Sequence, residues 1–242
     1  MDARYRGAKE AAKERGAEGN LEVFETALQA SSAVIARPLK DLLRLAESDK
    51  ELYASFYSLV EGEVRLPAGD KWDVLRRVAD SALFPYYEKE IRFAALTLDG
   101  LGLKSYGNCF MMLKPEMIES RASVFEENSV LFMERHGIQM SEANALPKGY
   151  RATWGNRARL AAVKLGGSID RSTSDADHAS ILVKQGGTTA EDDFIEVHIW
   201  GPFSVRTLER VTLLEGATMP GRAIIKRLIA KLKAVGVALE VS

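Results

Sequence analysis

A carboxylate and an imidazole stand two residues apart in DDFIEVHIWG at 192–201, the clearest strand-like stretch of the sequence. Alternation along a strand places Phe194, Glu196, His198 and Trp200 on one face. A lone carboxylate there must meet water, a donor or a cleft, because isolated burial is costly. Glu196 and His198 are therefore candidate catalytic residues that can share a ligand, and Trp200 can stack on a ring. The alternative is a strand with one solvated face, where Glu196 and His198 simply point outward.

A second candidate set, Arg121 and Ser123, lies in SRASVFEENSV at 120–130, just beyond the apolar stretch NCFMMLK. An arginine can bind a phosphate through two parallel N–H groups, and a serine hydroxyl can bond to an amide or a ribose hydroxyl. These two residues are candidate ligand-binding residues. The alternative is a turn that leads into a helix capped by Asn128.

The cysteine, the number of histidines and the glycine-rich stretches indicate no further functional site. Cys109 is the only cysteine, which excludes an internal disulfide and a multi-cysteine zinc site, and its apolar surroundings indicate a core residue. With only three histidines besides, we expect no metal site. The glycine-rich stretches at 100–107, 166–167 and 186–187 match neither a dinucleotide-binding GxGxxG nor a phosphate-binding P-loop, and we expect turns and helix ends there.

The composition is that of an ordinary globular protein. Apolar residues make up 46% and charged residues 28% of 242 residues, and 33 basic residues nearly balance 34 acidic ones. This balance disfavours a dedicated binder of nucleic acid or anionic membranes, although the basic side of the last helix could still dock a partner or nucleic acid. No apolar run is long enough to span a bilayer, and the first residues lack an apolar signal region. We therefore expect a cytoplasmic protein.

Residues 1–90 are predicted to be helical. Apolar residues at helical spacing follow Asn20 as far as Ala36, so we expect one helix there, broken by Pro38. Further helices are expected at 39–46, at 52–60 and at 71–84 after Asp70.

The pattern changes at Ile91. Strands are expected near 92, 108 and 194, with further short strands at 211–215 and 237–241. Helices are expected after Asn128 and over 154–167, 174–185 and 221–235. These elements predict an α+β fold in which an N-terminal helical region, 1–90, packs on a mixed or antiparallel β core, 91–242, as one compact unit.

Two stretches resemble a known family. IRFAALTLDGLGLKSYGNCFMMLKPEMIESRASVFEENS at 91–129 resembles a segment of an uncharacterised bacterial family, in which a Tyr/Phe-Gly turn, a strand, Leu-Lys/Arg-Pro-Glu and Arg-x-[Ser/Thr] follow one another. DDFIEVHIWGP at 192–202 resembles that family's YVEAQVHGP. The family is distantly similar to the ADP-ribosyltransferase superfamily, in which a late strand carries the catalytic glutamate.

This resemblance implies a transferase that consumes NAD. Glu196 would stabilise the oxocarbenium character that develops as the nicotinamide–ribose bond breaks, and His198 would orient a ribose hydroxyl. Arg121 would bind the pyrophosphate, and Tyr106 or Trp200 would stack on nicotinamide. Transferases that modify arginine carry a second glutamate two residues before the catalytic one, where this chain has Phe194.

The sequence leaves two functions open. One is transfer of ADP-ribose from NAD to a protein or nucleic acid, as in a bacterial toxin, effector or defence component. The other is a catalytically silent interaction domain that presents its last helix, with the basic residues Lys226 and Arg227, to a protein partner.

Overall fold

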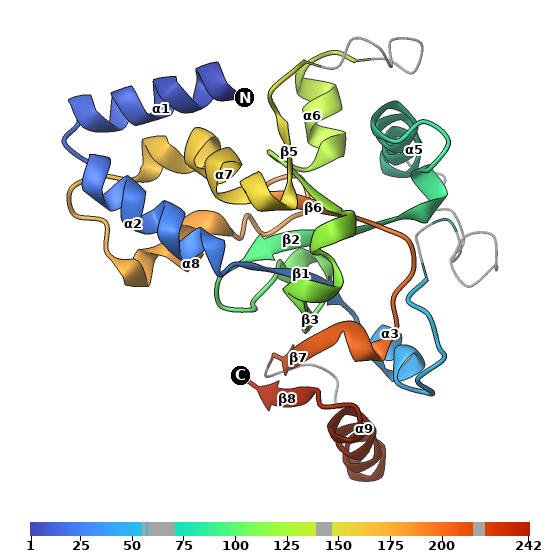
Figure 1. Cartoon of the computed structure of the whole chain (residues 1–242). Coiled ribbons are helices and arrows are strands. Elements are labelled where there is room, and N and C mark those ends of the chain that lie inside the picture. Colours follow the sequence, from blue (N-terminus) through green and yellow to red (C-terminus); the bar gives the residue numbers. More distant parts are fainter. Residues whose placement is uncertain (55–56, 58–70, 139–146, 215–220) are drawn as a thin grey trace.

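The structure is a computed structural model that describes residues 1–54, 57, 71–138, 147–214 and 221–242. An eight-stranded sheet in the order β5-β4-β6-β2-β1-β3-β7-β8 forms its centre (Figure 1). Neighbouring strands are antiparallel, except that β7 and β8 run parallel. The fold is therefore α+β with a mixed sheet, as the sequence predicted.

The strands are β1 (Ser32–Arg37), β2 (Ile91–Thr97), β3 (Cys109–Leu113), β4 (Ala122–Phe125), β5 (Arg151–Thr153), β6 (Glu196–Trp200), β7 (Leu208–Leu213) and β8 (Ala238–Val241). The α-helices are α1 (Asp2–Glu14), α2 (Glu18–Gln29), α3 (Leu39–Leu45), α5 (Lys71–Leu83), α6 (Ser129–Arg135), α7 (Arg157–Leu165), α8 (His178–Leu182) and α9 (Arg222–Ala234).

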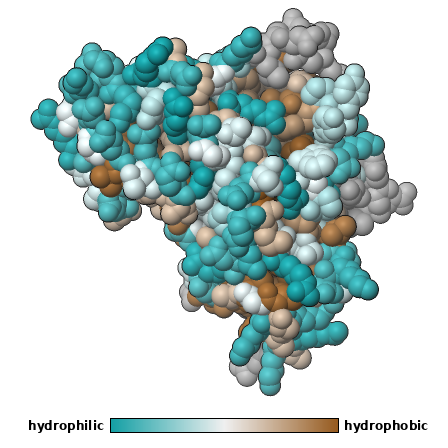
Figure 2. Space-filling view, viewed as in Figure 1, coloured by the Kyte–Doolittle hydropathy of each residue, from teal (hydrophilic) through white to brown (hydrophobic). Residues whose placement is uncertain are grey.

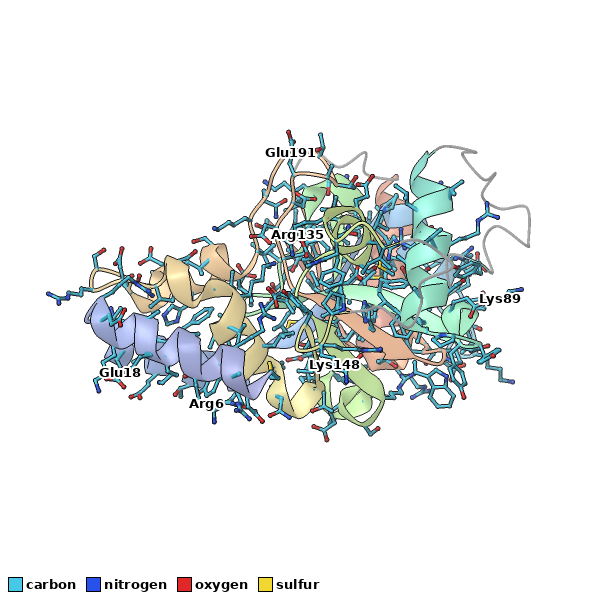
Figure 3. All side chains as sticks on the ribbon, turned by 90° about the horizontal axis from the view of Figure 1, so that it is seen from above. Arg6, Glu18, Lys89, Arg135, Lys148 and Glu191 are labelled. Carbon is cyan, nitrogen blue, oxygen red and sulfur yellow. The ribbon has the colours of Figure 1, made fainter. Side chains whose placement is uncertain are left out.

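Helices cover both faces of the sheet. The larger apolar cluster joins one sheet face to residues of α1, α2 and α7 at one end, and of α3 and α9 at the other. On the opposite face α5 and α6 pack together over Ile91 and Phe125. Seen from above, the α1, α2 and α7 layer and α5 lie on opposite sides of the sheet (Figure 3). The surface over α1 and α2 is mostly hydrophilic, whereas hydrophobic residues reach the surface between α5 and α6 (Figure 2).

The prediction that residues 1–90 form a helical region outside the sheet is wrong. The helix expected from Asn20 to Ala36 ends at Gln29, and Ser32–Arg37 forms β1 between β2 and β3. The segment is apolar on both faces because a central strand is covered on both sides, so it lacks the alternation that marks a half-buried strand. A boundary at residue 90 therefore does not separate helices from the sheet.

Several local predictions are confirmed. β2, β3 and β6 begin close to the expected positions, and Asn128 caps α6 by accepting a hydrogen bond from the Val130 N–H. Ser174 and Asp177 form a capping box at the start of the helix expected from residue 174. Most of the helix expected at 52–60 lies outside the described residues. Asp70, the residue expected to precede the helix at 71–84, lies outside them as well.

The strand β4 was missed, and it places two candidate residues. Its four residues are too few to show a periodicity, and their pairing on both sides, with β5 and β6, defines them as a strand. Ser123 lies directly opposite His198, and Phe125 lies opposite Glu196. The turn expected around Ser123 is thus wrong, and the sheet itself brings Ser123 beside the candidate catalytic strand.

Candidate functional site

Glu196 and His198 both lie beneath α5 and α6, inside the protein. Each is only 2% exposed, so the alternative of a solvated strand face is wrong. The His198 ring is in edge contact with Phe84 and Phe93 and stacks on Phe125. The strand alternation was predicted correctly, but the cover on this face comes from α5, which the sequence could not place over β6.

Glu196 is an ionised carboxylate whose partners are all internal. Its Oε1 accepts hydrogen bonds from His198 Nε2 at 2.8 Å and from the Ser129 N–H at 3.2 Å. Its Oε2 lies 3.6 Å from Arg76 Nη2. Burial acts to raise the pKa of Glu196, but the charge of Arg76 and the bonds from His198 and Ser129 outweigh it and lower the pKa to about 2. The carboxylate is therefore charged at neutral pH, and His198, Ser129 and Arg76 hold it in place.

Arg76 and Asp80 extend this network along α5. Arg76 donates to Ser129 Oγ at 2.9 Å, lies 3.5 Å from Asp80 Oδ1, and stacks over the Phe93 ring at 4.4 Å. Tyr57 donates to Asp80 Oδ2 at 3.0 Å. Burial, with a smaller contribution from Glu196, raises the pKa of Asp80 to about 7, although Arg76 opposes it. The sequence analysis missed both residues, because an Arg–Asp pair four residues apart is common on exposed helix faces.

Stability is expected to fall as the pH rises from about 6.5 to about 8, because Asp80 then loses its proton. Its folded-state pKa is raised, so the contribution is present at low pH and is lost above the pKa of about 7. The free energy of unfolding should drop by roughly 1 kcal/mol over this interval. Burial lowers the pKa of His198 in the folded protein, so this residue changes stability in the opposite direction, and the contribution of Asp80 is read from the difference between the wild type and Asp80→Asn. Urea unfolding at both pH values measures the drop; Asp80→Asn should abolish it, and an equal drop in that variant would contradict the assignment.

A pocket of about 440 Å³ opens beside His198. Four of the six candidate residues line it, namely Arg121, Ser123, His198 and Trp200. The remaining wall consists of Phe84, Tyr87, Ile91, Ala122 and Arg151. The structure thus brings the predicted phosphate-binding and stacking residues to the predicted catalytic histidine. It adds Arg151, which no motif in the sequence marks.

The two arginines of the pocket have only neutral partners. Arg121 donates to the carbonyl oxygens of Met117, Trp200 and Pro202 at 2.8–3.2 Å. Arg151 donates to Ser123 Oγ at 3.1 and 3.2 Å and to a backbone carbonyl of α5 at 3.3 Å. Neither forms an ion pair with a described residue, and burial lowers the pKa of both guanidinium groups. Arg121 is half-buried and Arg151 is exposed, and two guanidinium groups without a counter-charge at one pocket favour an anionic ligand.

Two predicted site residues are placed away from the pocket lining. Glu196 reaches the pocket only through His198, and Tyr106 is not among the lining residues. The Tyr106 hydroxyl accepts a hydrogen bond from Asn128 at 3.1 Å, and its ring packs edge-on against Phe194 at 6.4 Å. Burial raises the pKa of Tyr106 to about 12. Its expected role in stacking on a ligand ring is therefore replaced by a structural one beside α6.

His198 is held by a carboxylate through one ring nitrogen, and its other ring nitrogen is buried. Because its Nε2–H donates to the ionised Glu196, the neutral ring carries its lone pair on Nδ1, which has no hydrogen-bond partner among the described residues. Burial lowers the pKa of His198 despite the neighbouring carboxylate, so the neutral form dominates at neutral pH. A carboxylate that fixes the tautomer of an imidazole at a pocket wall can support proton transfer from a bound nucleophile.

Comparisons with known proteins add no relative. No family model matches the sequence, and no curated protein shows significant similarity to it. In the part of the chain that the structure describes, no helix is long and apolar enough to cross a membrane, and no three potential metal ligands lie together.

Proposed function

We propose that the protein transfers ADP-ribose from NAD to a macromolecular acceptor, and that NAD binds in the pocket beside His198. One observation carries the proposal: two arginines without acidic partners line the same pocket as an exposed indole and an imidazole base. A dinucleotide such as NAD offers the matching groups, an anionic pyrophosphate, aromatic rings and ribose hydroxyls.

In this proposal each part of NAD contacts different lining residues. Arg121 and Arg151 bind the pyrophosphate, the Trp200 ring stacks on nicotinamide, and Ser123 bonds to a ribose hydroxyl. In the reaction the bond between the ribose C1′ and nicotinamide breaks, and nicotinamide leaves with the electron pair. The acceptor forms the new bond to C1′ and gives its proton to His198 Nδ1. Glu196 acts through His198, by orienting the ring and stabilising its protonated form.

The direct test is calorimetry with NAD, followed by incubation of the protein with labelled NAD and cell lysate. Label that enters protein, RNA or DNA identifies the acceptor class. Release of nicotinamide without labelling would indicate hydrolysis, and the absence of NAD binding would refute the proposal.

Arg151→Gln and Arg121→Gln are each expected to weaken NAD binding roughly 10- to 100-fold, because each removes charged hydrogen bonds to phosphate. Calorimetric titration measures the dissociation constants. Arg135→Gln is the matched control, since Arg135 belongs to α6, pairs with Glu127 and does not line the pocket (Figure 3). Equal affinities in all four proteins would show that the arginines do not bind the ligand.

A second candidate function, binding of a protein partner through α9, has its own observation. Ile224 and Ile229 are 48% and 46% exposed on this helix, while Leu228 and Leu232 pack into the core. Affinity capture with wild type and with Ile229→Glu would test it. Loss of a captured protein in the variant, together with absent NAD binding, would favour an interaction domain.

A further inference from the structure

A second pocket, of about 670 Å³, lies between α2, α8 and the loop that follows β2. Helix α8 lies next to α2 there, and the ring of Phe24 meets that of His178 edge-on with 5.1 Å between the centroids (Figure 1). No residue of this pocket also lines the pocket beside His198. A ligand of the second pocket would therefore be independent of the proposed transfer of ADP-ribose.

The charged residues that line the second pocket are all acidic, namely Glu22, Asp99 and Asp175. Lys9 pairs with Glu22 at 3.0 Å, whereas neither aspartate forms an ion pair with a described residue. Arg210 donates to the backbone carbonyl oxygen of Asp99, and its charge pairs with Glu240 at 3.5 Å. Two carboxylates at one pocket without a counter-charge favour a cationic ligand.

His178 gives a second, independent indication of a ligand. The residue lines the pocket and is only 4% exposed, yet its ring nitrogens have no hydrogen-bond partner among the described residues. Buried polar side chains ordinarily have such a partner, because burial without one costs free energy. A neutral imidazole carries a lone pair on one nitrogen, so it can accept a hydrogen bond from a ligand N–H in the pocket.

The remaining lining residues decide what kind of cation fits. They are mostly apolar and include Val23, Ala27, Leu98 and Ala179. Pockets for small molecules typically combine such a surface with a few polar groups that orient the ligand. A bare metal ion would leave the apolar surface unused, and within the described ranges no three potential metal ligands lie together. A cation that carries aliphatic carbon can contact both parts of the lining.

We propose that the second pocket binds a small aliphatic polyamine. Its ammonium groups pair with Asp99 and Asp175, its methylene groups lie against the apolar residues, and one N–H donates to His178. The proposal goes beyond the proposed function and does not depend on it.

The test is calorimetric titration with spermidine and, separately, with Mg²⁺, at about 0.1 M salt to limit general charge attraction. The wild type should bind spermidine and bind Mg²⁺ far more weakly. The double variant Asp99→Asn/Asp175→Asn should bind spermidine about 10-fold more weakly. Asparagine keeps the side-chain oxygen with which Asp99 accepts the Leu101 N–H, so the loop should keep its conformation. His178→Phe keeps a ring against Phe24 but removes both nitrogens, and should weaken binding about 5-fold.

The matched control is the double variant Glu116→Gln/Glu209→Gln, which removes the same charge from two exposed residues outside the pocket. It should bind spermidine like the wild type. Equal losses in the two double variants would show general attraction between a polyamine and an acidic surface, and would overturn the proposal. No binding of millimolar spermidine by the wild type, undiminished binding by Asp99→Asn/Asp175→Asn, or equally tight binding of Mg²⁺ would also overturn it. Melting temperatures show whether His178→Phe folds; if it does not, the two double variants alone decide the outcome.

Discussion

Glu196→Gln is expected to lower the free energy of unfolding by about 3 kcal/mol or more, because it removes one partner of a buried ion pair. The glutamine keeps the shape of the side chain, but Arg76 then faces a neutral amide, with only Asp80 left as its counter-charge. Urea unfolding followed by circular dichroism measures the loss.

A double-mutant cycle with Arg76→Met isolates the pair. The loss in the double variant should be clearly smaller than the sum of the two single losses, because the uncompensated charge is gone. Lys9→Met provides a surface comparison, since Lys9 pairs with the exposed Glu22 and should change stability by less than about 1 kcal/mol. A loss under about 0.5 kcal/mol for Glu196→Gln would contradict the role of this carboxylate as a structural charge.

His198→Gln is expected to reduce NAD turnover by about 10²–10⁴-fold while NAD still binds. The glutamine amide can still donate a hydrogen bond to Glu196, but it offers no basic nitrogen to the acceptor. The measurements are nicotinamide release and acceptor labelling, with NAD affinity determined in parallel.

The pH profile supplies a second readout for this residue. Since burial lowers the pKa of His198, turnover in the wild type should be constant around neutral pH and should fall only as the ring gains a proton at lower pH. His178→Gln is the matched control, because His178 is also buried but packs on Phe24 and lines no part of this pocket. Full turnover by His198→Gln would exclude proton transfer by this ring.

Local patterns predicted much of the fold. Turn and cap residues such as Asn128, Ser174 and Asp177 act over a few neighbours, so their geometry is decided within the segment that contains them. β1 was not predicted, because burial on both faces removes the alternation of apolar and polar residues that distinguishes a strand from a helix. β4 and β5 are strands only through pairing with distant partners, and their few residues carry too little signal.

The candidate site shows the same difference between what local patterns determine and what contacts between distant segments determine. The sequence by itself determined that Glu196, His198 and Trp200 share one strand face, because alternation is a property of the extended chain. Only the tertiary structure decided that α5 covers this face, that Arg76 makes Glu196 an internal charge, and that Arg151 comes from β5 to the pocket. These placements depend on which elements pack together, and packing joins residues that are far apart in the chain through contacts that no local pattern encodes.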